Sequence, residues 1–525
     1  MDNVADIYPL SPVQLGMLFH TLAGETGVYI NQYTCQLKGA VDSDRLRQAW
    51  QQTVAHHPVL RTAFLWEGLD EPLQVVRSQV SLPWSLLDWQ HLTDPAAELA
   101  TFLQRDRQRP FDLAQAPLLR LTLIRLSDTC TQLVWTSHHL LFDGWSLPLI
   151  WQDLLACYQG QQPTSRRPYR DFIAWQQQQH TAASKPFWRS QLQAATAPTP
   201  LPAARTGGRP SSSYQQCTRR LTPALTAAIN AFVRGQRLTL NTLVQAAWAL
   251  LLHHYSGHHQ VTYGAVVSGR PASLAGVETM VGLFINTLPV SVAIDADAHL
   301  TDWLQQRQQQ LLDLRQHEAT PLSDIQRWRG LGNTAPGGSE LGSGTLFNSI
   351  VVFENYPSTD ADNLPFTVEQ ARYLEQSNYP LALLVLPGDA LELMLLHDTG
   401  QFESGAVEHL LDYLELLLTT AVEQPQIRLS ALPRLTPQQL PSPQPSSSLA
   451  CVHTLIEAQA AATPHAAAVQ FDDHILTYSE LNQRANQLAR QICAYRPDAN
   501  AADSAPTRAA SPPPPSAAPN IDHSF

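Results

Sequence analysis

Two adjacent histidines, His138 and His139, are the residues of this chain whose types and spacing most clearly allow chemistry. They stand in the stretch SHHLLFDGWS, residues 137–146, where three apolar residues separate them from Asp143 and Gly144. An imidazole can accept a proton near neutral pH, bind a metal ion, or pack in a core with its nitrogens hydrogen-bonded. The stretch is therefore compatible with a catalytic base, a metal site, or a buried strand that ends in a turn.

The strand pattern that precedes the histidines narrows these alternatives. Residues 131–137 read as a strand, in which successive side chains point to opposite faces. His138 and His139 then cannot easily aim at one point, which counts against a metal site, since zinc needs convergent nitrogens and a third ligand. The pattern favours one histidine that faces a cavity and one that packs inside, before a turn at Asp143 and a helix from Trp145. Two interpretations stay open: catalysis by one of the histidines, and a purely structural role for both at the end of a buried strand.

A lone cation upstream is expected to brace this turn. An amphipathic helix is predicted over 42–57, capped by Asp42 or Ser43, and it leads into HHPVLRTAF, residues 56–64. Arg61 there is surrounded by apolar residues, and a buried cation needs a carboxylate partner. Asp143 is the expected partner, unless both residues lie at the surface and never meet. The pair would leave Asp143 unavailable as a proton carrier.

The remaining patterns predict two mixed α/β halves of similar size. The expected strands cover 118–126, 131–137, 260–268 and 346–353. The expected helices cover 145–159, 221–235, 239–255, 299–315 and 404–423. A segment rich in Pro, Gly and Ser, 195–213, is typical of a linker that crosses between the halves.

Composition excludes several classes of protein. The chain has 525 residues, of which 44% are hydrophobic and 15% charged, so it can build a large core. A net charge of −12 argues against nucleic acid as a partner. The six cysteines form no CxxC pair, which indicates free thiols in a reducing compartment. The sequence has neither a signal peptide pattern nor an apolar run of membrane-spanning length, so a cytoplasmic protein without membrane association is expected.

Taken together, five motifs in order make the sequence resemble the condensation domains of nonribosomal peptide synthetases. The histidine motif has the family pattern of two histidines, three variable residues and Asp-Gly. The other four motifs are SPVQLGMLF at 11–19, HHPVLRTAF at 56–64, YRDFIAW at 169–175 and VGLFINTLPV at 281–290. The resemblance covers roughly residues 7–435. The sequence departs from the family pattern at the last motif, where LFNSIVVFENYP, 346–357, offers only Asn348 as a match.

The resemblance implies an α/β fold of the chloramphenicol acetyltransferase type. Two such subdomains, residues 1–180 and 181–435, would form a V-shaped pseudodimer around a central tunnel. In it, the amine of a downstream aminoacyl thioester would attack the thioester carbonyl of an upstream acyl or peptidyl group. The activity implied is that of an acyltransferase that forms peptide bonds.

The resemblance also assigns expected roles to residues. His139 would act as the base or position the amine, and Gly144 would bring a backbone N–H to the oxyanion. His138, Asp143 and Arg61 would support the site, and the tunnel residues would be Trp145, Asn286 and Ser11. We expect no metal, including at the histidine group 253–259, and no bound cofactor. The substrates would arrive on phosphopantetheine arms of upstream and downstream carrier proteins or synthetase modules, with no nucleic acid or membrane involved.

The end of the chain suggests a second, incomplete domain. A Pro/Ser linker is expected at 436–450, and residues 451–495 resemble the start of an adenylation domain, with LTYSEL at 476–481. The Ser/Thr/Gly-rich phosphate loop of that family does not occur, so no adenylation activity is expected. The Pro- and Ala-rich stretch 496–525 is expected to be disordered. This organisation leaves an alternative to catalysis, namely a non-catalytic remnant or docking fragment of a broken synthetase module.

Overall fold

The computed structural model divides into two compact units, Met1–Pro443 and Gln444–Phe525. The described residues are 3–23, 28–179, 181–195, 197–202, 204, 213–330, 345–354, 365–374, 378–434, 459–471 and 474–494. Among them, no helix is both long and apolar enough to cross a bilayer. The expected linker at 436–450 and the tail at 496–525 lie outside the described residues.

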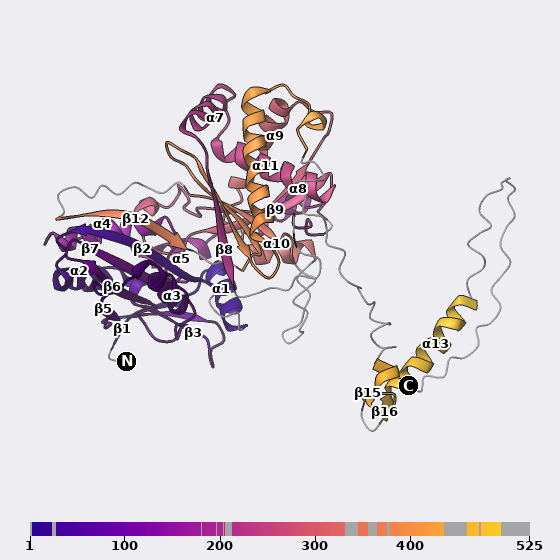
Figure 1. Cartoon of the computed structure of the whole chain (residues 1–525), viewed down its shortest axis with the longest axis horizontal. Helices are drawn as coiled ribbons and strands as arrows, with labels where there is room; N and C mark the ends of the chain where they lie inside the picture. Colours follow the sequence, from indigo (N-terminus) through magenta and orange to yellow (C-terminus); the bar gives the residue numbers. More distant parts are fainter. Residues whose placement is uncertain are drawn as a thin grey trace. The chain divides into compact units, whose positions relative to one another are not determined.

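A five-stranded sheet forms the centre of the first half. Its order is β12-β2-β7-β6-β5, with β6 and β5 parallel and the other pairs antiparallel. The strands are β2 (Ile30–Gly39), β5 (Trp84–Asp88), β6 (Leu119–Ser127), β7 (Cys130–His138) and β12 (Phe366–Leu374). The predicted strands at 118–126 and 131–137 are confirmed as β6 and β7. Figure 1 shows β12, coloured orange, beside β2, so a late segment of the chain completes this sheet.

The first half also contains a smaller second sheet and several helices. The small sheet has the order β1-β4-β3, from β1 (Val4–Pro9), β4 (Leu73–Arg77) and β3 (Thr62–Leu65). The helices are α1 (Pro12–Leu22), α2 (Ser43–His56), α3 (Pro95–Arg107), α4 (Ser146–Tyr158) and α5 (Tyr169–Gln177), with short 3-10 turns at η1 (Pro58–Arg61) and η2 (Thr181–Ser184). The predicted helix over 42–57 is confirmed, with the Asp42 carboxylate accepting hydrogen bonds from the backbone amides of Asp44 and Arg45 at its start.

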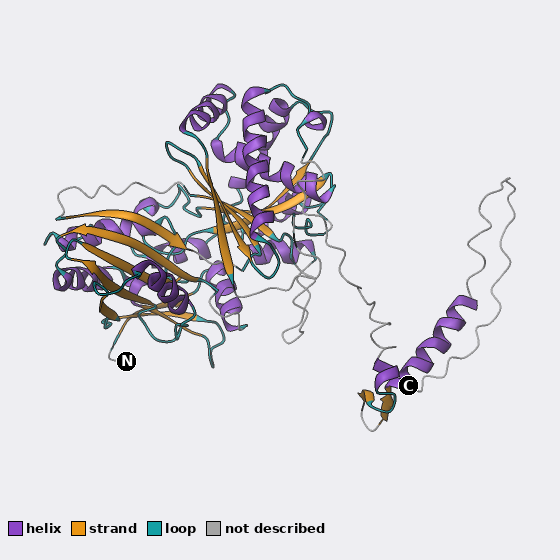
Figure 2. Ribbon diagram, in the orientation of Figure 1, coloured by secondary structure: helices purple, strands orange, loops and turns teal. Residues whose placement is uncertain are grey.

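The second half contains a six-stranded sheet with the order β10-β9-β11-β13-β14-β8. Its strands are β8 (Tyr214–Arg220), β9 (Gln260–Val267), β10 (Asn286–Ala293), β11 (Ser349–Phe353), β13 (Leu381–Leu386) and β14 (Glu392–Asp398). Its helices are α6 (Lys185–Gln191), α7 (Pro223–Gly235), α8 (Leu240–Ser256), α9 (Leu300–Arg315), α10 (Leu322–Arg329) and α11 (Ser404–Glu423), with 3-10 turns at η3 (Val277–Thr279) and η4 (Leu429–Ala431). Every residue of α8 from Thr242 to Leu252 is buried, as expected of a helix that is mostly apolar all round. Figure 2 shows the strands of this half in orange with helices in purple beside them.

The two halves of the first unit share core residues. The connection between β9 and β10 contributes apolar side chains to the core of the first half. These side chains are Leu274, Val277, Met280, Val281, Leu283 and Phe284. Phe366 of β12 joins the same core. The segment that carries the VGLF motif is therefore held against the residues that follow β7.

The second unit, taken by itself, contains a two-stranded antiparallel sheet and a helix. The sheet pairs β15 (Ala467–Phe471) with β16 (His474–Thr477), and α13 (Tyr478–Ala494) follows directly. At the start of α13, Thr477 and Glu480 form a reciprocal cap, in which the Thr477 amide donates to Glu480 and the Glu480 amide donates to Thr477.

Candidate active site

The histidine pair lies where β7 ends, and the two rings have different environments. The amide of His138 donates to the Leu118 carbonyl, and the amide of His139 donates to the Tyr29 carbonyl. Both side chains are buried, yet His139 lines a cavity of about 280 Å³ and His138 does not. The expectation that one histidine faces a cavity while the other packs inside is confirmed, and it follows from the alternation of an extended chain.

Hydrogen bonds place the ring hydrogens of the two histidines on opposite nitrogens. The His139 Nδ1 atom lies 2.9 Å from the Phe142 carbonyl oxygen, which can only accept, so Nδ1 carries the hydrogen. In the neutral ring, Nε2 of His139 is then the basic atom. The His138 Nδ1 atom instead accepts from the Leu140 amide at 3.2 Å, so the hydrogen of the neutral ring is on Nε2. Burial, and secondly the neighbouring His139, lower the pKa of His138 to about 3.

The carboxylate of Asp143 is held by the second half of the chain. Its Oδ1 atom lies 3.1 Å from the Arg270 guanidinium and 2.8 Å from the Ser146 hydroxyl, and its Oδ2 atom accepts from the Phe284 amide at 3.0 Å. The Asp143 amide donates to the Gly282 carbonyl. These contacts occupy both carboxylate oxygens and tie the turn to the connection between β9 and β10.

The predicted pair between Arg61 and Asp143 is wrong. Arg61 donates to the backbone carbonyls of Arg77 and Ser78 at the end of β4. The side chain therefore satisfies its charge on carbonyl oxygens of a neighbouring strand. Sequence reasoning found the carboxylate but missed Arg270. The signal that could have found it was the SGRP stretch at 268–271, a lone arginine in the loop after a buried strand.

The cation at Arg270 is enclosed as completely as its partner. Its side chain is 3% exposed and that of Asp143 is 1% exposed. One guanidinium nitrogen donates to the carbonyls of Val277 and Met280, and the group lies 3.9 Å from the centre of the Phe284 ring. The rigid fork of N–H donors on a guanidinium suits a cation that must satisfy several acceptors at once. Arg270 thus ties the connection between β9 and β10 to the turn after the histidines.

Two neighbouring cavities are bordered by the residues that follow His139. The first, of about 280 Å³, has His139 and Gly144 in its lining. The second, of about 350 Å³, is lined by Asp143 and Trp145. Both cavities share lining residues that come from the second half: Val266, Ile285 and Val352. The turn after the histidines therefore contributes to the walls of two adjacent cavities, both lined in part by the second half.

The other residues expected to line the tunnel border different cavities. The Trp145 indole borders the second cavity and donates to the Glu278 carbonyl at 3.0 Å. Asn286 borders the first cavity, while its side-chain amide donates to the carbonyls of Glu318 and Thr320 at 2.8 Å each. Ser11 caps α1 and borders a small space of about 20 Å³, which shares Val13, Ile285 and Asn286 with the first cavity. The structure thus brings Asn286 to the cavity of His139, but not Ser11.

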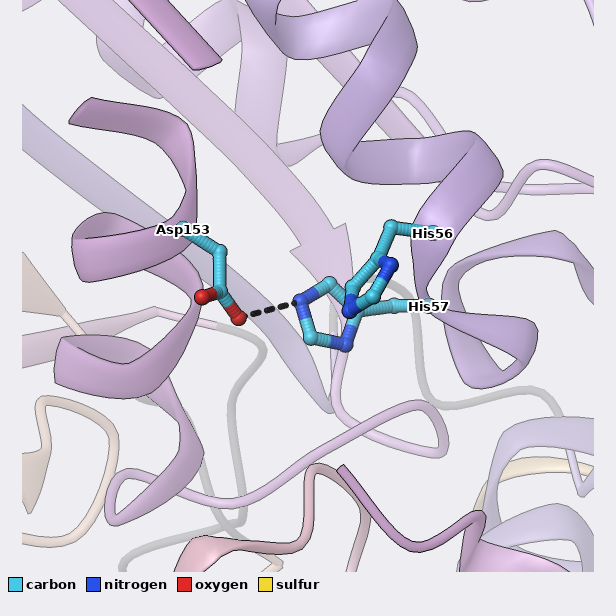
Figure 3. A group of neighbouring side chains, drawn as sticks. All are labelled: His56, His57 and Asp153. Atoms are coloured by element: carbon cyan, nitrogen blue, oxygen red, sulfur yellow. Dashed lines mark ion pairs between the residues drawn. The ribbon is translucent and has the colours of Figure 1, made fainter. Parts of the chain in front are cut away.

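A histidine–carboxylate cluster elsewhere has the composition of a metal site. Among the described residues, His56, His57 and Asp153 bring their ligand atoms within 4.8 Å of one another (Figure 3). Asp153 already lies 3.0 Å from His57 and 2.8 Å from the Arg166 guanidinium, and His56 contacts the Thr164 carbonyl at 2.8 Å. A fixed guanidinium on the carboxylate opposes a second cation, so these residues do not fit a metal ion. In the described part of the chain, the histidines at 253–259 do not form such a group.

Comparisons with known proteins find one matching family and several related proteins. A family model described as Condensation domain matches residues 4–439. A linear gramicidin synthase protein from Brevibacillus parabrevis is 41% identical over 522 residues, and chondramide synthase cmdD of Chondromyces crocatus is 37% identical over 489 residues. These alignments cover 94% and 83% of this chain, but only 7% and 12% of the relatives, so the chain spans a small part of either protein.

Solved structures share the fold at lower identity. The first condensation domain of the calcium-dependent antibiotic synthetase, in complex with a substrate analogue, has a TM-score of 0.69 at 17% identity and covers 83% of this chain and 100% of that chain. A four-domain nonribosomal peptide synthetase bound to AMP and glycine has a TM-score of 0.70 at 20% identity, covering 94% and 39%. The X-domain from teicoplanin biosynthesis has a TM-score of 0.69 at 24% identity, covering 81% and 97%.

Proposed function

Because the chain belongs to the condensation-domain family, we propose that it joins two carrier-bound thioesters through an amide bond. The amine of the downstream aminoacyl thioester attacks the carbonyl carbon of the upstream acyl thioester. A C–N bond forms, the C–S bond breaks, and one proton moves from nitrogen to the departing thiolate. The observation that carries this proposal is the position of His139, whose ring borders a cavity that adjoins a second one.

In this proposal, Nε2 of His139 receives the proton of the attacking amine or holds the amine in place. The hydrogen bond from Nδ1 to the Phe142 carbonyl supports either role, because it fixes the tautomer and the orientation of the ring. The carbonyl dipole also favours the imidazolium that forms when the ring takes up a proton. Gly144, which borders the same cavity, would supply a backbone N–H to the oxyanion of the intermediate.

His138 and Asp143 would support the site without contacting the substrates. The neutral His138 ring accepts the Leu140 amide and so shapes the backbone just after His139. The Asp143 carboxylate fixes the turn that carries Gly144. Positional precision of this kind matters, because a misplaced reacting group loses much of the rate that comes from proximity.

The substrates would reach the cavities on phosphopantetheine arms of two carrier proteins. Two cavities that share lining residues and are both bordered by residues of 143–145 are consistent with two activated substrates that meet at one point. The relatives are large synthetases, of which this chain matches only a small part. We therefore propose carrier domains or neighbouring synthetase modules as the partners, in the cytoplasm.

The residues after the first unit are proposed to be the opening of an adenylation domain. The alignment with the linear gramicidin synthase protein covers 94% of the chain and so extends past the family match at residues 4–439. The β15–β16–α13 unit contains the LTYSEL motif at 476–481.

The decisive experiment measures amide formation between two loaded carrier proteins. His139→Ala should lower the rate by about 10²–10⁴ while the far-UV CD spectrum stays native. His91→Ala, a substitution of an exposed histidine, is the matched control and should keep the wild-type rate. A wild-type chain that forms no amide would instead favour the alternative, a non-catalytic docking fragment. Equal rates for wild type and His139→Ala would remove the proposed role of the ring.

A further inference from the structure

A glycine on the wall of the first cavity has no local structural cause. Gly16 lies in the middle of α1, and its φ is not in the left-handed region that requires glycine. A Cβ atom built at this position would meet no heavy atom within 4 Å outside the helix backbone nearby. Glycine inside a helix costs roughly 0.5–1 kcal/mol relative to alanine. Neither backbone conformation nor packing therefore explains why α1 lacks a side chain at this position.

The side chain that Gly16 lacks would point into the first cavity, because Gly16 lies on the face of α1 that borders it. Residues of α1 border the first cavity from Pro12 onward, and Val13, Gly16, Met17 and His20 among them have the spacing of one helix face. His139 borders the same cavity. Because a Cβ at position 16 would enter open space on this face, a longer side chain there would extend into the cavity and reduce its volume.

A second glycine sets back an aromatic wall of the same cavity. Phe347 and Tyr379 both border the cavity, and their rings stack with their centres 5.4 Å apart. A Cβ built on Gly264 of β9 would lie 2.4 Å from an atom of the Phe347 ring. The Phe347 ring can therefore lie against the strand only because residue 264 has no side chain. Two glycines thus enlarge this cavity, one from α1 and one through Phe347.

The chemistry of the lining limits what the cavity can hold. Of the described residues that border it, none is Asp, Glu, Lys or Arg. The second cavity differs, since Asp143, Arg315 and Glu318 border it. The lining does include two imidazoles, His20 and His139. An ionised group that leaves water for the first cavity would lose hydration without gaining a permanently charged counter-ion, which is strongly unfavourable.

We infer that the first cavity holds one of the two substrates and selects for an uncharged, bulky, apolar side chain on it. In this inference Gly16 is a specificity-determining residue, because it sets the width of the cavity. The inference rests on the proposed function and names the substrate class of the same site. An apolar side chain in this cavity would contact Met17, Phe347 and Ile350. A substrate with a carboxylate or ammonium side chain would be excluded by desolvation rather than by size.

The test compares carrier-bound thioesters of glycine, phenylalanine and glutamate, each offered in turn as the upstream and the downstream substrate. For one of the two positions, wild type should use phenylalanine at least tenfold better than glutamate. Gly16→Leu should lower kcat/KM for phenylalanine about 10–200-fold relative to glycine, the range expected for small size differences in an apolar pocket. Gly235→Leu is the control, since that helical glycine also faces open space but borders neither cavity.

Binding of unreactive pantetheine amides with the same three acyl groups separates this inference from the proposed function. If no thioester pair forms an amide, the proposed function fails, and binding still decides the inference. Tighter binding of the phenylalanyl amide that Gly16→Leu abolishes, with Gly235→Leu unchanged and both variants native by CD, would support it. Equal use or binding of glutamate and phenylalanine, or the same loss for glycine and phenylalanine in Gly16→Leu, would overturn it.

Discussion

The Arg270 guanidinium lies 3.1 Å from the Asp143 carboxylate, and the two residues are 127 positions apart in the sequence. This pair connects the turn after the histidines to the connection between β9 and β10. Both side chains are removed from water, so each buried charge is stabilised by the other as its counter-ion. The geometry at His139 and Gly144 therefore depends on contacts that the second half of the chain provides.

Removal of one partner of this pair should strongly destabilise the first unit. Arg270→Met is expected to lower the free energy of unfolding by about 3–5 kcal/mol, because it leaves the Asp143 carboxylate buried without its cation. Urea unfolding followed by CD measures the change. Arg125→Met is the matched control, because Arg125 pairs with Asp128 at the surface, and its effect should be much smaller. A similar loss for the two variants would contradict the bracing role of Arg270.

Stability should fall as the pH drops below about 6.5, in part through His138. Its folded pKa of about 3 lies below the ordinary value, so the unfolded chain takes up a proton first. The stabilisation is complete above the unfolded pKa and is lost as the pH falls toward the folded pKa. Protonation of Nδ1 would also break the bond from the Leu140 amide.

The measurement for this prediction is the slope of unfolding free energy against pH between 7 and 4. His138→Asn retains an acceptor for the Leu140 amide but does not titrate, so its slope should be smaller than that of wild type. His91→Asn, at an exposed position, should keep the wild-type slope. Parallel slopes for all three chains would show that His138 contributes nothing to the acid sensitivity.

A methyl group at residue 282 should disturb the same region by overpacking. A Cβ on Gly282 would lie 2.2 Å from the Tyr169 ring, whose hydroxyl is hydrogen-bonded to the Leu283 carbonyl at 2.6 Å. We expect Gly282→Ala to cost about 1–3 kcal/mol and to slow amide formation, because Gly282 also accepts from the Asp143 amide. Gly405→Ala, where a Cβ meets nothing within 4 Å, should leave stability within about 1 kcal/mol of wild type. Unchanged stability of Gly282→Ala, judged by thermal unfolding, is the contrary result.

Zinc should not stabilise the protein through the cluster around Asp153. Burial raises the pKa of this carboxyl, but hydrogen bonds from His57 and Arg166 outweigh it and bring the value down to about 2. The carboxylate is thus already matched by the guanidinium. Melting temperatures with added zinc and with a chelator should agree. A rise with zinc that disappears in His57→Gln would show instead that the cluster binds metal.

Local patterns predicted many of the elements near the site. The helix expected at 239–255 is α8, Leu240–Ser256, and the strand expected at 131–137 is β7, Cys130–His138. Their periodicity is a property of neighbouring residues, so sequence suffices to detect it. The strand β12 was not predicted, because its sequence, FTVEQARYL, has no clear apolar alternation and most of its middle residues are exposed. It is a strand because β2 of the first half offers it a partner.

The sequence by itself determined the chemistry that this chain can offer: two histidines on opposite faces of a strand end, a turn with Asp143 and Gly144, and motifs shared with one family. Only the tertiary structure decided that Asp143 meets Arg270 rather than Arg61, and that Gly16 and Phe347 wall the cavity of His139. Alternation and capping act over a few residues and leave a trace in the sequence. The partner of a buried charge and the lining of a cavity depend on which distant segments the packed core brings together.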